Sequence, residues 1–303
     1  MEMFGHLLLL SVLYMECLVG FTVNMIILTT IFMKWKTQRS LPTCDKILSH
    51  LAISRGLFFV SVIMGNLIFQ FSPWLLQNDV MISILIIQTG FVFNSNLWIA
   101  SVLCVFYCVR IVTYNCALCV FLRSRISTLV PWLVTAALVM SLISSLPLGW
   151  FGFDYKTQNT LNDSTGNKTE NEFVIVPNFD NWFLILILGS FPPFLIFCVA
   201  NFLLINFLLI HTRRMRNVTS HNLRSHFGAL KSMSLFLVLQ IIFFIFMSFS
   251  ALGKFPQSKI FITVYWLFIC FPSLFHSFFL FFSSNDLRKI FVSKCLSCIK
   301  SVP

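Results

Sequence analysis

The side chains best suited to chemistry in this sequence are a few polar residues set inside long apolar runs. Glu16 and Asn24 are eight residues apart, a spacing that places both on one face of a helix. Arg55, His276 and Ser277 also lie within apolar runs. Because a charge is costly there, we expect Arg55 to face inward and to bond Asn24 or Ser277. Such a network either only fastens helices together or also takes part in conformational switching.

Catalytic and metal-binding patterns are absent from the sequence. It has no HExxH, no GxSxG and no glycine-rich phosphate-binding loop. The pairs Cys104/Cys108 and Cys116/Cys119 could be metal ligands, but no His or carboxylate accompanies them. Packing is therefore the better interpretation of these cysteines. We predict a protein that is not an enzyme and that holds no metal or cofactor.

The composition indicates an integral membrane protein. Of its 303 residues, 58% are hydrophobic and 10% are charged, whereas a soluble domain carries about 25% charged residues. The formal charge of +11 could point to nucleic acid, but the basic residues sit in short segments between apolar runs. We predict a protein that contacts membrane lipid and does not bind nucleic acid.

Seven apolar segments are long enough to cross a bilayer. About 20 apolar residues span the hydrocarbon core, and a helix satisfies every backbone polar group within its own segment. We therefore predict an all-α fold, a single seven-transmembrane helix bundle over residues 1–303. The predicted spans are residues 7–33, 47–71, 81–109, 127–149, 182–210, 231–252 and 259–283.

The basic residues divide unequally between the two sides of these spans. Lys and Arg gather in the loops after the first, third and fifth spans and in the tail, residues 284–303. The opposite side holds only Lys156, Lys168, Lys254 and Lys259. Since cytoplasmic loops accumulate basic residues, we predict an extracellular N-terminus and a short cytoplasmic tail.

Two segments outside the spans carry signals of modification. The long outer loop, residues 150–181, has N-glycosylation sequons at Asn162 and Asn167, where we expect glycans. A third sequon, at Asn217, falls on the predicted cytoplasmic side and should stay unmodified. In the tail, Cys295 and Cys298 are either palmitoylated or unmodified.

Six of the spans carry short motifs in a consistent order. The first two contain Glu16, Gly20 and Asn24, and then Leu51-Ala52-Ile53-Ser54-Arg55. The third contains Trp98 and ends with Phe106-Tyr107-Cys108-Val109-Arg110-Ile111. The last three contain Pro193-Phe194 with His211-Thr212, His226 with Ala229-Leu230-Lys231, and His276-Ser277 with Leu280. Together these motifs resemble the type 2 (bitter) taste receptors, a family of G-protein-coupled receptors.

The resemblance implies a multi-pass plasma-membrane receptor. Such a receptor binds small bitter agonists at the outer end of its bundle and activates a heterotrimeric G protein of the gustducin-like, inhibitory class. The family's pocket corresponds here to Thr89, Phe93, Asn94, Phe243 and Trp266. Phe93 and Phe243 stand where the family often has Asn and Tyr, which changes the polarity expected of the pocket.

The predicted coupling residues lie at the cytoplasmic ends of spans 3, 5 and 6. Tyr107 and Arg110 are three residues apart and share a helix face, and we expect His211 and Lys231 to face the same cavity. Arg110 replaces the Lys that is usual in the family. The alternative is that the basic members of this set only fix the topology.

Two other classes of function are weighed against this one. A vomeronasal type 1 pheromone receptor is a related seven-helix chemoreceptor for another cue. A transporter or channel would need a through-going polar path, and many transporters have internal repeats, which we do not find in this sequence.

Overall fold

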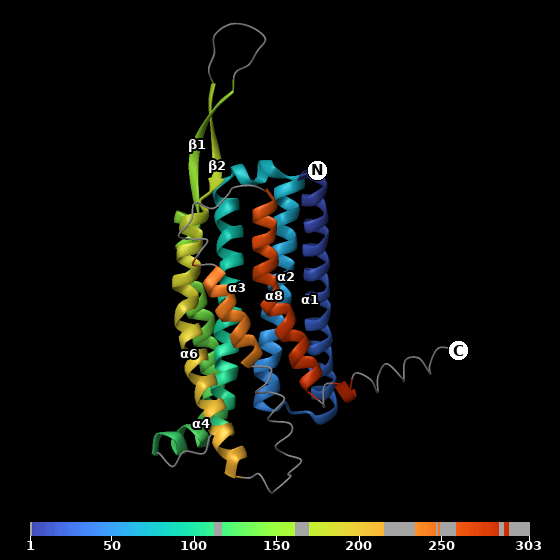
Figure 1. Ribbon diagram of the computed structural model, residues 1–303, viewed down its shortest axis with the longest axis vertical. Helices are drawn as coiled ribbons and strands as arrows, with labels where there is room; N and C mark the ends of the chain where they lie inside the picture. Colours follow the sequence, from blue (N-terminus) through green and yellow to red (C-terminus); the bar gives the residue numbers. More distant parts are fainter. Residues whose placement is uncertain are drawn as a thin grey trace, which may run out of the picture.

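The computed structural model describes residues 2–111, 117–160, 170–214, 234–246, 248, 259–284 and 288–290. These residues form a bundle of long helices with a β-hairpin projecting from one end (Figure 1). The long helices are α1 (Glu2–Gln38), α2 (Thr43–Phe71), α3 (Asp79–Ile111), α4 (Ala117–Ser145), α6 (Phe179–Arg214) and α8 (Lys259–Ser283). The shorter elements are η1 (Pro73–Gln77), α5 (Leu148–Phe151), β1 (Phe153–Thr160) and β2 (Glu170–Pro177).

Six helices of the described chain are long and apolar enough to cross a membrane. A further apolar helix, Ser234–Phe246, falls within the predicted span 231–252. The predicted all-α membrane bundle is thereby confirmed. The six are Phe4–Gln38, Thr43–Phe71, Asp79–Ile111, Val120–Phe151, Leu184–Phe207 and Ile260–Ser283.

The bundle has apolar side chains on its outer surface and polar side chains in its interior. Trp132 is 74% exposed and Phe202 is 62% exposed, whereas Asn24 and Arg55 are each 1% exposed. Large exposed apolar surfaces are unfavourable in water but not against lipid chains. The distribution of side chains therefore matches a membrane environment.

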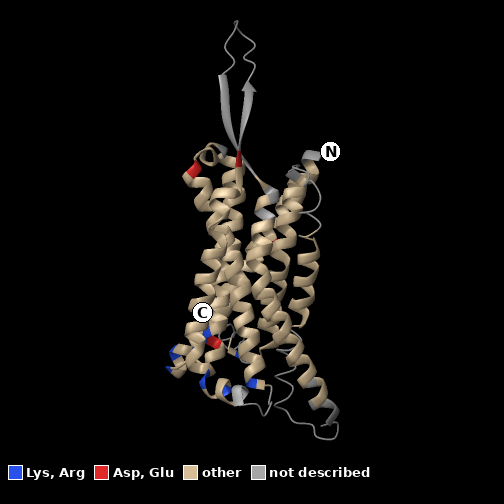
Figure 2. Ribbon diagram, turned by 90° about the vertical axis from the view of Figure 1, so that its left-hand side faces the viewer, with Lys and Arg blue, Asp and Glu red and all other residues tan. Residues whose placement is uncertain are grey.

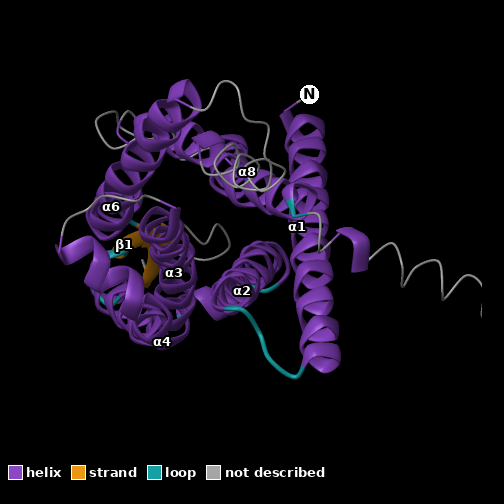
Figure 3. Ribbon diagram, turned by 90° about the horizontal axis from the view of Figure 1, so that it is seen from below, coloured by secondary structure: helices purple, strands orange, loops and turns teal. Residues whose placement is uncertain are grey.

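Helix α3 is surrounded by other helices, and α2 separates it from α1. α3 packs against α2, α4 and α6, while α1 packs against α2 and α8 (Figure 3). Gly20 of α1 lies against the ring of Phe59 on α2, and a Cβ added there would overlap this ring. Because glycine has no side chain, the two helices can approach closely at this point.

The outer loop contains regular structure that the sequence analysis did not anticipate. β1 and β2 pair in antiparallel register, from Phe153 opposite Pro177 to Thr160 opposite Glu170. The β-branched run Val174-Ile175-Val176 explains the preference of β2 for a strand. The sequons at Asn162 and Asn167 lie outside the described residues, so their glycosylation stays a prediction.

Charged residues are unevenly distributed along the bundle axis. In Figure 2, the described Lys and Arg residues gather at the end opposite the hairpin. The N-terminus lies at the hairpin end (Figure 1). This arrangement supports an orientation with the hairpin outside the cell, which remains a prediction from the positive-inside rule.

We predict that Gly20→Ala lowers both the surface expression and the thermal unfolding midpoint of the protein, since the new methyl group collides with the buried Phe59 ring. Flow cytometry and thermal unfolding of purified protein measure the two effects. Gly5→Ala is the matched control on the same helix, because a Cβ at Gly5 meets nothing within 4 Å. Equal behaviour of the two variants would show that the α1–α2 contact tolerates a side chain.

Candidate functional site

A cluster of hydrogen bonds joins three helices at the centre of the bundle. Arg55 of α2 donates from Nη1 to Ser277 Oγ at 3.1 Å, and its Nη2 lies 2.6 Å from His276 Nδ1. Ser277 Oγ in turn lies 3.1 Å from Asn24 Oδ1 on α1. All four side chains are 1% exposed or less. We call Asn24, Arg55, His276 and Ser277 the central polar cluster.

Aromatic contacts connect the central polar cluster to the helix Ser234–Phe246. The Arg55 guanidinium lies 5.6 Å from the centre of the Phe236 ring. The same ring is stacked on His276, with 4.2 Å between the ring centres. A guanidinium over an aromatic face is attracted by the ring quadrupole. A fourth helix therefore contacts the buried charge directly.

Glu16, the remaining residue of the predicted intramembrane network, lies apart from this cluster. It lines an apolar cavity between α1 and α8, together with Met15, Phe268 and Phe271. Within the described chain, its Oε1 is buried and has no hydrogen-bond partner. Although Glu16 and Asn24 share a helix face, two turns of α1 separate them, roughly 12 Å along its axis.

A second feature is a cavity near the hairpin end of the bundle, which we call the outer cavity. It has a volume of about 160 Å³ and lies among α2, η1, α3 and α8. Most of its lining is apolar, and its polar side chains are Ser61, Asn66, Thr89 and Trp266. An apolar concavity with a few polar groups is the usual form of a small-molecule site.

The structure does not bring all the predicted pocket residues together. Thr89 and Trp266 line the outer cavity. Both also border, with Phe93, a void of about 10 Å³, and the Phe93 ring lies 5.7 Å from that of Phe243. Asn94 instead turns toward α4, where its Nδ2 lies 3.2 Å from Ser144 Oγ and 3.3 Å from Ser145 Oγ. It is absent from the lining of both cavities.

Asn66 and Ser61 line the outer cavity but were not among the residues expected from the sequence. A sequence signal for Asn66 did exist. It follows Arg55 by eleven residues, which is close to three helical turns and returns to the same helix face. An inward-facing Arg55 therefore implies an inward-facing Asn66.

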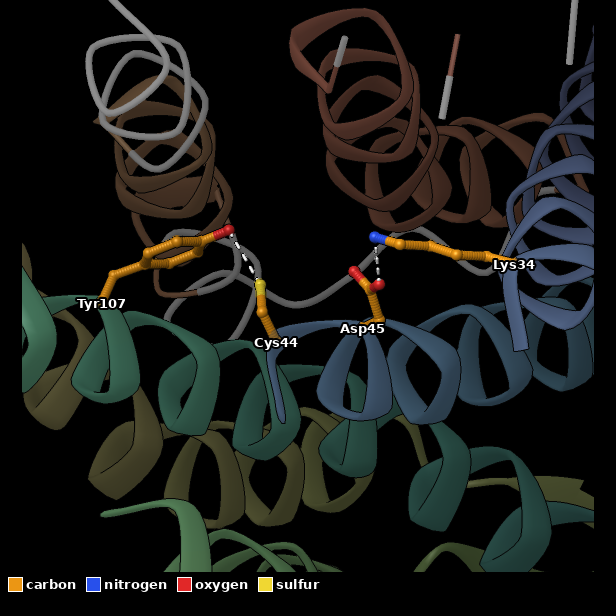
Figure 4. A network of polar contacts seen from close by, with 4 residues as sticks. All are labelled: Lys34, Cys44, Asp45 and Tyr107. Carbon is orange, nitrogen blue, oxygen red and sulfur yellow. Dashed lines mark hydrogen bonds and ion pairs between the residues drawn. The ribbon is translucent and has the colours of Figure 1, made fainter. Parts of the chain in front are cut away.

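At the cytoplasmic end, Tyr107 contacts a residue that the sequence analysis had not linked to it. Tyr107 Oη lies 3.1 Å from Cys44 Sγ at the start of α2. Beside it, Lys34 of α1 forms an ion pair with Asp45 Oδ2 at 2.7 Å. Figure 4 shows both contacts, which together join α1, α2 and α3.

Of the other predicted coupling residues, only Arg110 has a described side chain. Arg110 is exposed, and its guanidinium lies 5.8 Å from the centre of the Phe106 ring. His211 belongs to α6, but its side chain is not described, and Lys231 lies outside the described residues. The common cavity expected for these residues remains a prediction.

Comparison with known proteins identifies the family. A sequence model of the family described as taste receptor protein (TAS2R) matches residues 1–300. The chain belongs to the type 2 taste receptor family. It is 28% identical to mouse taste receptor type 2 member 39 over 242 residues, which cover 78% of this chain and 75% of the relative. It is 27% identical to human taste receptor type 2 member 9 over 294 residues, which cover 94% and 92% of the two chains.

Family membership, predicted from the sequence motifs, is thus confirmed. Together with the apolar helices, it makes this protein a bitter taste receptor of the G-protein-coupled class. It also makes the protein a multi-pass protein of the plasma membrane, with a ligand and a G protein as its partners.

We predict that Arg55→Ala abolishes surface expression or signalling of this taste receptor, because it removes the donor shared by Ser277 and His276. Arg55→Lys should restore only part of the loss, since an ammonium lacks the planar fork that reaches both partners. Surface labelling and calcium responses in transfected cells measure both effects. The exposed Arg123→Ala on α4 is the control. Wild-type expression and response in Arg55→Ala would show that the cluster is dispensable.

Proposed function

We propose that this receptor senses small bitter compounds in the outer cavity and activates a gustducin-like heterotrimeric G protein of the inhibitory class. The observation that carries the proposal is the cavity of about 160 Å³, with its apolar walls and few polar groups. Sites for drug-sized ligands usually measure about 300–1,000 Å³. The volume therefore favours a compact ligand.

Two helices, α2 and α8, connect the outer cavity with the central polar cluster. Asn66 on α2 and Trp266 on α8 line the cavity. Each lies eleven residues, about three turns, from a member of the central polar cluster on the same helix, namely Arg55 and Ser277. A ligand that draws α2 and α8 into a different packing therefore acts on the cluster between them. Its effect is limited to the difference between its affinities for the two packings.

The cytoplasmic response is proposed to use Tyr107, Arg110, His211 and Lys231. Among these, Tyr107 has the best-supported role, because its contact with Cys44 joins the ends of α2 and α3. We propose that this contact holds the resting arrangement and is exchanged for G-protein contacts on activation. In this account the protein has no catalytic role, and the pheromone-receptor and transporter alternatives are not favoured by its relatives.

The test of ligand binding is a calcium-response screen of bitter compounds in cells that express the receptor with a chimeric gustducin-type α-subunit. We expect Trp266→Ala to raise the half-maximal concentration of an active compound by at least ~10-fold, since covering a large apolar side chain contributes ~1.5–3 kcal/mol. Trp132→Ala is the matched control, because Trp132 is 74% exposed on the lipid-facing surface. A response that needs no G protein, or equal sensitivity of both variants, would contradict the proposal.

The same assay tests the cytoplasmic contact. Tyr107→Phe and Cys44→Ala each remove one partner of the 3.1 Å contact. We expect both to change basal or maximal activation in the same direction at equal surface expression. If both give wild-type dose–response curves, the contact has no part in coupling.

A further inference from the structure

Among the residues that the structure describes, no carboxylate is paired with the buried Arg55 guanidinium. Its partners, Ser277 and His276, are neutral hydrogen-bonding groups, and its Nε has no partner among the described residues. Asp45 is engaged by Lys34, and it precedes Arg55 by ten residues, roughly 15 Å along α2. A cation in a medium of low dielectric constant requires a counter-charge more than it requires further neutral partners.

Two other buried side chains have donors without a partner among the described residues. Asn96 of α3 is 4% exposed, and neither atom of its side-chain amide has a partner within the described chain. His276 Nε2 likewise lacks one. Because His276 Nδ1 accepts from Arg55, we assign the ring proton to Nε2, which makes that atom a donor as well. Buried polar atoms in folded proteins are rarely left without a partner.

The helix register places Arg55 and Asn96 at the same level of the bundle, on the neighbouring helices α2 and α3. The rings of Phe58 on α2 and Phe93 on α3 lie 6.1 Å apart. Arg55 precedes Phe58 by three residues and Asn96 follows Phe93 by three, and residues at this spacing share a helix face. Because α2 and α3 run in opposite directions (Figure 1), both residues lie one turn beyond the Phe58–Phe93 contact, toward the same end.

We propose that the receptor binds a small monovalent anion, of which chloride is the obvious example, between Arg55 Nε and Asn96 Nδ2. The site offers N–H donors and one positive charge, so it selects an anion over a cation. The ion must be small, since Arg55 is 1% exposed and Asn96 is 4% exposed in the packed interior of the bundle. This inference does not depend on the identity of the bitter ligand or of the G protein.

The test measures thermal unfolding of the purified receptor in lipid nanodiscs, with chloride replaced by gluconate at constant ionic strength. We expect the unfolding midpoint to rise with chloride concentration, because a ligand that binds the native state stabilises that state. At chloride concentrations above the dissociation constant, the rise should follow the logarithm of the concentration. Bromide should act as chloride does. An unfolding midpoint that is the same in chloride and gluconate would mean that water or neighbouring side chains satisfy these donors, and would overturn the proposal.

Asn96→Asp provides the sharper test, since it places a fixed carboxylate where the anion is proposed to bind. We expect this variant to unfold at a higher temperature than wild type in gluconate and to be unaffected by chloride. Asn94→Asp is the matched control, because Asn94 is equally buried on the same helix but faces Ser144 and Ser145; it should keep the chloride effect. Should Asn96→Asp fail to fold, Asn96→Leu should raise the chloride concentration required by several-fold. Wild-type chloride dependence in the Asn96 variants would remove Asn96 from the site.

Discussion

The charge of Arg55 imposes the constraint on which the rest of the bundle depends. An Arg at the centre of a membrane helix costs about 2.5–3.5 kcal/mol on the insertion scale. A hydrogen bond between membrane helices contributes on average only about 0.6 kcal/mol. The two bonds to Ser277 and His276 therefore do not offset the cost alone. Contact with the Phe236 ring adds to the stabilisation, and the anion proposed above would supply the rest.

This need for compensation also explains how one residue can organise several helices. The groups that satisfy Arg55 come from α8 and, through Ser277, from α1, while Phe236 belongs to the helix Ser234–Phe246. When these helices shift relative to one another, the partners of the charge must be exchanged rather than simply lost. A packed core that can satisfy a charge in two discrete ways is the kind of bistable element that signalling requires.

The sequence predicted the fold and the direction of Arg55 because few alternatives exist inside a membrane. Apolar runs of sufficient length become helices, and a charged residue within them turns toward polar partners. The side chains of Asn94 and Asn66 were harder to place, since an amide has many possible neutral partners and each choice differs by little energy. Asn94 donates hydrogen bonds to two serines on α4. These serines lie near Asn94 because α3 packs against α4, which no local sequence pattern indicates.

Two further contacts were not predictable from the sequence for different physical reasons. The Cys44–Tyr107 contact joins residues 63 positions apart whose types indicate no particular partner, so only the register of α2 against α3 brings them together. The hairpin of β1 and β2 lies in a segment that its charged residues and sequons present as a polar loop. Strand formation depends on the partner strand as much as on local preference. Because each segment of the sequence was considered separately, the pairing of β1 with β2 was not predicted.

The most direct test of the central role of Arg55 is a double-mutant cycle between Arg55 and Ser277, measured as thermal unfolding midpoints of the purified receptor in lipid nanodiscs. The cycle compares Ser277→Ala in the wild-type background with the same substitution in an Arg55→Met background. The account predicts a clearly larger loss in the wild-type background, because there the substitution removes an acceptor from a buried charge. Equal losses in both backgrounds would show that the two residues are not coupled, and would contradict the account.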